Sequence, residues 1–101
     1  MTEAHPLARK ISLPNRLGTD NASVLLGLLA PHVLDRNPIL LDAQQVSDVQ
    51  TSGLQILLAF MRVRREAGTR TRWLNASGIL LESAARHGIA AALGLAGDFG
   101  A

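Results

Sequence analysis

The sequence contains no cysteine and almost no aromatic side chains. None of its 101 residues is Cys or Tyr, and aromatic residues make up only 3%. Because the chain has no thiol, it cannot form disulfides, use a thiol in catalysis or bind a metal through thiolates. Hydrophobic residues nevertheless make up 48% of the chain. The core must therefore be built from Leu, Ile, Val and Ala.

The excess of positive over negative charge is also small. The formal net charge is only +2, which is a weak basis for binding a polyanion. Nucleic-acid-binding proteins also use aromatic rings on which bases stack, and this chain has almost none. We therefore expect no nucleic-acid partner.

Long apolar runs are missing as well. The longest, residues 24–30 and 89–95, are far shorter than the roughly 20 residues of a membrane-spanning helix. Residues 1–10 carry no apolar segment of the kind found in signal peptides. We expect a cytoplasmic protein without direct membrane insertion. The length suits one domain, residues 1–101.

Patterns typical of enzyme sites are absent too. The three histidines, His5, His32 and His87, have no metal-ligand spacing. There is no Gly-x-Ser-x-Gly motif and no Gly-Lys-Ser/Thr phosphate loop. Ser52 has no evident His and Asp partners in the order of a catalytic triad. We expect neither enzymatic activity nor a cofactor or metal.

What the chain does contain is an alternation of short apolar segments and amphipathic helices. The predicted elements are a strand at residues 7–13, a helix from residue 22 that Pro31 ends or kinks, a strand at residues 39–41, a helix from Thr51 to Gly68, a strand at residues 70–74, a helix from Ser77 to Gly88, and a last turn or short helix within residues 89–95. This order predicts an α/β fold with a mostly parallel sheet and helical crossovers.

The start of the second helix is the most informative segment. Four backbone N–H groups lack partners at a helix start, and the dipole there is positive. Either hydroxyl of Thr51 and Ser52 can cap that end, and a phosphate is tolerated there. Gly53 permits close backbone approach. Our hypothesis is that Thr51 is a control point, whereas Ser52 mainly caps the helix.

Residues 39–54, ILLDAQQVSDVQTSGL, resemble without a gap the signature of STAS domains (sulfate transporter and anti-sigma factor antagonist). That signature is an apolar strand ending in Asp, a loop of about eight residues, and Asp-Ser-Ser-Gly-Leu opening a helix. Asp42 matches the strand-ending Asp, and residues 51–54 match Ser-Ser-Gly-Leu. The resemblance extends over roughly residues 11–95. It implies a STAS-like fold with a mostly parallel or mixed sheet of about four strands.

The resemblance also implies a function. In anti-sigma factor antagonists of this family, the partner is a serine/threonine kinase that also acts as the anti-sigma factor. It phosphorylates the first Ser of the motif, and this phosphorylation blocks its binding to the antagonist. Thr51 occupies that position. Two features depart from the family pattern: Gln50 replaces the acidic residue before the phosphorylated position, and the amino-terminal hairpin looks shortened. Asp48 is a candidate to replace the missing acid, whereas Asp42 is expected to end its strand and bond to the following loop.

The chain is accordingly predicted to be a regulatory module that binds a protein partner. The switch residues are Thr51 and Ser52, and the predicted partner-binding residues are Asp42, Asp48, Gln50, Thr51, Ser52, Gly53 and Gln55. The alternatives are a STAS subunit that binds the ABC ATPase of a lipid transporter without phosphorylation, and a chemotaxis-associated accessory protein. A small-molecule sensor also stays open.

An arginine-rich segment has two interpretations. Its members are Arg62, Arg64, Arg65, Arg70 and Arg72. The simpler interpretation is a solvated face. The alternative is a surface for an acidic partner or for membrane headgroups.

Overall fold

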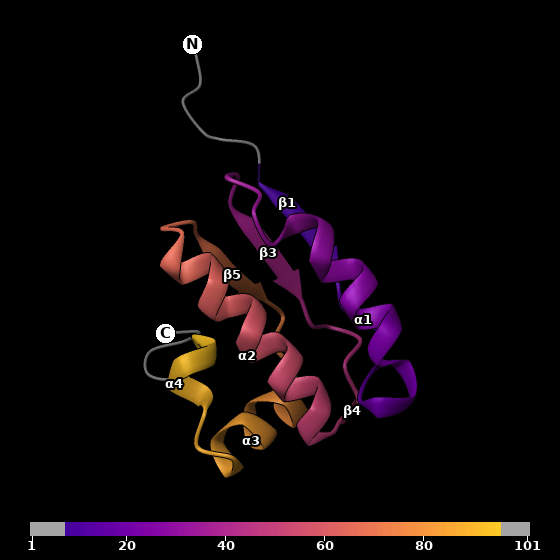
Figure 1. The fold of residues 1–101 in the computed structure, drawn as a ribbon. Helices are drawn as coiled ribbons and strands as arrows, with labels where there is room; N and C mark the ends of the chain where they lie inside the picture. Colours follow the sequence, from indigo (N-terminus) through magenta and orange to yellow (C-terminus); the bar gives the residue numbers. More distant parts are fainter. Residues whose placement is uncertain (1–7, 96–101) are drawn as a thin grey trace.

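The computed structural model describes residues 8–95, in which strands and helices alternate (Figure 1). The elements are β1 (Arg9–Ser12), β2 (Arg16–Leu17), α1 (Ala22–Leu29), β3 (Ile39–Asp42), β4 (Asp48–Val49), α2 (Thr51–Glu66), β5 (Thr71–Leu74), α3 (Gly78–Arg86) and α4 (Ala90–Leu93). Short 3-10 turns at Thr19–Asn21 and Ala30–His32 flank α1. The predicted α/β class is confirmed. None of the helices in this part of the chain is long and apolar enough to cross a membrane.

The strands form two small parallel sheets. The larger has the order β1-β3-β5, and the smaller pairs β2 with β4. Parallel neighbours require crossover connections, and α1 and α2 supply these in the larger sheet. Because both crossovers advance in the same direction, right-handedness places both helices on one face of the sheet, where they lie side by side (Figure 1). The expected single sheet of about four strands is thus a three-stranded sheet and a separate pair.

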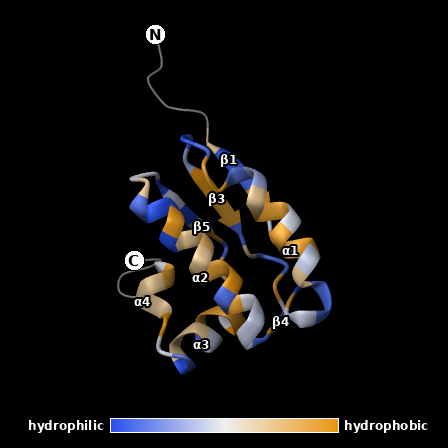
Figure 2. Ribbon diagram, in the orientation of Figure 1, coloured by the Kyte–Doolittle hydropathy of each residue, from blue (hydrophilic) through white to orange (hydrophobic). Residues whose placement is uncertain are grey.

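The core lies between the larger sheet and the two helices that cover it, α1 and α2. Most of the central strand β3 is strongly hydrophobic (Figure 2), and the buried residues of α2 include Leu54, Leu57 and Phe60. Ile39, Leu41 and Leu57 are fully buried. On the last strand, Trp73 is buried, and its indole Nε1–H donates to the carbonyl of Leu93 at 2.7 Å. That bond fastens α4 to the sheet.

The predicted helix ends are confirmed at three positions. Gly68 and Gly88 have positive φ angles of 75° and 71°, which favour glycine and end α2 and α3. Ser77 caps α3, because its Oγ accepts a hydrogen bond from the N–H of Leu80 at 3.3 Å.

Two short strands were missed by the sequence analysis. The chain segment before α1 contains β2, so a second strand does precede the first helix. The predicted loop at residues 42–50 contains β4. Strands of two residues are too short to show an alternating pattern. The predicted first strand, residues 7–13, is observed as Arg9–Ser12, and its residue 7 lies outside the described residues.

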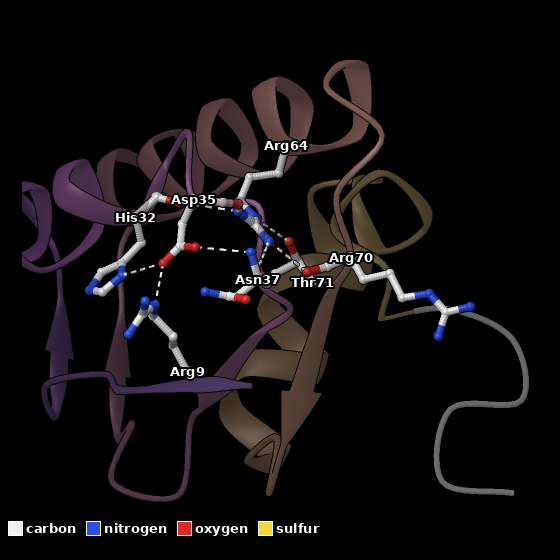
Figure 3. Close-up of polar contacts among 7 residues, drawn as sticks. All are labelled: Arg9, His32, Asp35, Asn37, Arg64, Arg70 and Thr71. Carbon is white, nitrogen blue, oxygen red and sulfur yellow. Dashed lines mark hydrogen bonds and ion pairs between the residues drawn. The ribbon is translucent and has the colours of Figure 1, made fainter. Parts of the chain in front are cut away.

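Arg64 departs from the predicted solvated face, because its side chain is fully buried beneath α2 (Figure 3). Its guanidinium donates to Thr71 Oγ1 at 2.7 Å. It also donates to four backbone carbonyls, at 2.5 to 3.1 Å, which belong to His32, Asp35, Asn37 and Arg70. Burial lowers the pKa of Arg64, and the nearby carboxylate of Asp35 opposes this shift. The guanidinium therefore joins α2 to the segments before β3 and β5.

Replacing Arg64 by methionine should strongly destabilise the protein. Arg64→Met leaves several carbonyls without a donor, so urea unfolding should show a loss of about 3 kcal/mol. Arg62→Met, at an exposed position of the same helix, is the matched control and should change the unfolding free energy by less than about 0.5 kcal/mol. Equal losses in the two variants would show that the buried bonds contribute nothing specific.

Asp35 gives a second prediction, on acid stability. The N–H of Asn37, bonded to Oδ1 at 2.9 Å, lowers the pKa of Asp35 below its usual 3.8, Arg9 adds to this effect, and partial burial opposes it (Figure 3). Stabilisation from a lowered pKa is complete above the unfolded value and is lost as pH falls through the folded one. The urea concentration at the unfolding midpoint should decrease as the pH is lowered from 4. In Asp35→Asn, this decrease should be smaller. Identical pH profiles would contradict this role.

Candidate functional site

The start of α2 is fixed to the smaller sheet. Gln50 is extended and immediately precedes the helix, and its N–H donates to the carbonyl of Leu17 at 2.8 Å. Its side-chain Oε1 accepts from the N–H of Thr19 at 3.0 Å. The first turn of α2 is therefore held against the segment that joins β2 to α1, rather than projecting freely into solvent.

Gly53 allows this close contact, as predicted. A Cβ atom at this position would lie 2.3 Å from the carbonyl oxygen of Leu17, a backbone atom that cannot easily move aside. Gly53 is accordingly buried. It acts on the site indirectly, by permitting α2 to begin directly against β2.

A methyl group at position 53 should therefore disturb the site. Gly53→Ala should lower the free energy of unfolding by about 2 kcal/mol, because the backbone of β2 must shift. Gly27→Ala is the matched control, because a Cβ within α1 meets nothing within 4 Å. It should be neutral or stabilising by up to about 1 kcal/mol. The comparison is made by urea unfolding, and a neutral Gly53→Ala would overturn the packing argument.

The prediction that Ser52 caps α2 is wrong. No side chain caps this helix, and the capping position belongs to Gln50. Thr51 and Ser52 are already helical, so their hydroxyls point to other partners. Ser52 Oγ lies 2.9 Å from Thr19 Oγ1, and Ser52 is half-buried. The serine therefore helps to tie α2 to the turn before α1.

Thr51 is exposed, and its hydroxyl meets a residue that the sequence analysis did not select. Thr51 Oγ1 lies 3.1 Å from Nε2 of His87, at the end of α3. The other ring nitrogen, Nδ1, lies 2.8 Å from the carbonyl of Ser83. A carbonyl only accepts, so Nδ1 carries the hydrogen. In the neutral ring Nε2 is then an acceptor, and the threonine hydroxyl donates to it.

A mostly apolar pocket opens beside this pair. Its volume is about 180 Å³, and it is lined by Thr51, Leu54, Gln55, Leu58, His87 and Ile89. Gln55, a predicted partner-binding residue, thus shares a surface with Thr51. The pocket lies between α2 and the turn that connects α3 to α4. Of the residues that line it, only His87 has an ionisable side chain.

Asp42 shapes a turn. At the end of β3, its Oδ1 accepts from the N–H of Gln44 at 3.1 Å and from Asn75 Nδ2 at 3.3 Å. These bonds lower the pKa of Asp42, Lys10 contributes to the shift, and partial burial opposes it. The expectation that Asp42 ends its strand and bonds to the following loop is confirmed.

Asp48 is half-exposed on β4, and its carboxylate lies 3.6 Å from Arg16 Nε. Arg16 also pairs with Asp20, at 2.9 Å. These contacts belong to a small ionic cluster at the smaller sheet. They connect Asp48 with β2 and the turn before α1, whereas Thr51 connects with α3.

The pair formed by Thr51 and His87 is the chemically distinctive feature of this site. Within residues 8–95, no three His, Asp or Glu side chains gather where they could hold a metal ion. The hydroxyl is accessible, oriented by a hydrogen bond and set on a fixed helix start. Such a group suits recognition by another protein and covalent modification. Comparison of the sequence with models of known protein families gives no match, and comparison with curated proteins gives none either.

Proposed function

We propose that the chain is a small STAS-type regulatory module that binds a protein partner through the surface around Thr51. We call this the Thr51 surface and define it by Gln50, Thr51, Ser52, Gln55 and His87. The proposal draws on the gapless resemblance of residues 39–54 to the STAS signature. The observation that carries it is the exposed hydroxyl at the start of α2.

The partner in this proposal is a serine/threonine kinase that also acts as an anti-sigma factor. It docks on the Thr51 surface and transfers the terminal phosphoryl group of ATP to Thr51 Oγ1. The bond from the γ-phosphorus to the bridging oxygen breaks, ADP leaves, and the hydroxyl proton passes to a base of the kinase. The product carries about −1.5 to −2 added charge at pH 7. Because the backbone at this helix start is held by Gly53 and Gln50, the modification alters the surface and leaves the fold intact. Partner binding is thereby lost.

A second candidate is docking on an ABC ATPase without phosphorylation. One observation favours it: Gln50 stands where the signalling branch has an acidic residue, and its side chain is engaged with the N–H of Thr19. The neighbouring apolar pocket also suits insertion of a partner side chain. In this case the same surface serves as a permanent contact.

A charge substitution distinguishes the two. The partner is identified by capture with the full chain from native lysate and is then purified, and its affinity is measured by calorimetry. Under the kinase proposal, Thr51→Glu should weaken binding about tenfold or more, through repulsion at a desolvated contact, and Thr51→Ala should bind within about threefold of the unchanged chain.

Ser23→Glu is the matched control, because Ser23 is an exposed serine near the start of another helix, α1. It should leave the affinity unchanged. Equal affinities for Thr51→Glu and Thr51→Ala, with no phosphate found on Thr51 by mass spectrometry, would reject the switch and favour the ATPase contact.

A further inference from the structure

The contact between Thr51 and His87 suggests how the phosphorylated state is held, an inference that rests on the proposed modification of Thr51. We infer that His87 is the phosphate-binding residue of phosphorylated Thr51 and that it becomes a cation when it takes this role. The modified hydroxyl then links the start of α2 to the end of α3.

The imidazole is aimed at Thr51 by a bond that does not depend on Thr51. Nδ1–H donates to the carbonyl of Ser83, one turn earlier in α3, at 2.8 Å. This bond fixes the ring orientation and leaves Nε2 directed at Thr51 Oγ1, 3.1 Å away. A group added to that oxygen therefore meets Nε2.

Phosphorylation reverses the direction of the hydrogen bond. In the neutral ring, whose hydrogen is on Nδ1, the unmodified hydroxyl donates to Nε2. A phosphate dianion has only acceptors, so it cannot donate to that nitrogen. Nε2 must take a proton from solvent, and an imidazolium–phosphate hydrogen bond replaces the neutral one. Because Nδ1–H stays on the carbonyl of Ser83, the added proton serves the phosphate alone.

The surroundings have room for this change. A gap of 3.1 Å between Oγ1 and Nε2 does not admit a phosphoryl group. Because the ring stays bonded to the carbonyl of Ser83, the side chain of Thr51 must rotate to make room. His87 is exposed and is followed by Gly88, which is also exposed. The adjoining pocket, of about 180 Å³, offers space on the other side.

No competing anion lines that space. From α2, the pocket is lined by Thr51, Leu54, Gln55 and Leu58, and from the turn before α4 by Ile89. All of these are uncharged. On α3 itself, the residue next to His87 is Arg86, which adds positive charge. The phosphate is thus the anion available to His87 among the groups that line the pocket.

The test uses the full chain with phosphothreonine installed at position 51 by genetic code expansion, so it needs neither the kinase nor the partner. Long-range proton–nitrogen NMR spectra at pH 7 report the protonation of His87. The unmodified protein should show a neutral ring with hydrogen on Nδ1, and the phosphoprotein a doubly protonated ring. Spectra of His87→Gln identify the His87 signals.

Stability provides the second readout. In the phosphoprotein, His87→Gln should lower the thermal midpoint by about 3 °C more than it does in the unmodified protein. His87→Lys should recover most of that difference, because it restores a cation. The difference should shrink as NaCl is raised toward 1 M, since exposed ion pairs are screened.

A His87 ring that stays neutral in the phosphoprotein would overturn the inference. So would a thermal midpoint with the same response to His87→Gln in both proteins. Either result leaves the proposed switch intact, because that switch is judged by partner affinity. Conversely, unchanged partner affinity after phosphorylation rejects the switch without affecting the His87 result.

Discussion

The buried guanidinium of Arg64 is the interaction on which the arrangement of this small domain most depends. It donates to four backbone carbonyls and to Thr71, and these acceptors belong to the segments that enter β3 and β5. Parallel strands have no tight turns to set their positions. The planar guanidinium of arginine has five N–H donors and can fix the segments that lead into β3 and β5 beneath one helix. The ammonium group of lysine has only three donors and cannot do so.

The other end of α2 is fixed by different means. There the helix meets β2, and the contact depends on a missing side chain at Gly53 and on the amide of Gln50. The smaller sheet thus serves as a support for the helix start, although it has only two residues in each strand. With both ends of α2 held, the position of Thr51 is set by the scaffold.

Local patterns predicted most of the fold. The breakers Gly68 and Gly88 and the cap Ser77 were visible because each acts on its own helix end. Residues whose roles depend on distant partners were misjudged: Arg64 looked like part of a solvated face, and Ser52 looked like a cap. The pairing of Thr51 with His87 joins positions 36 apart in the chain, and no periodicity or spacing signals such a contact. The contact exists because α3 packs against the smaller sheet.

Trp73 carries a consequence of a different kind. Its indole is buried and bonded to the carbonyl of Leu93, so it sits where α4 meets the sheet. It is also the sole Trp of the chain. Its intrinsic emission therefore belongs to a single location and reports the detachment of α4 without any added label. Since α4 follows His87 by only a short turn, this native fluorophore is bonded to the helix that comes directly after the Thr51–His87 pair in the chain.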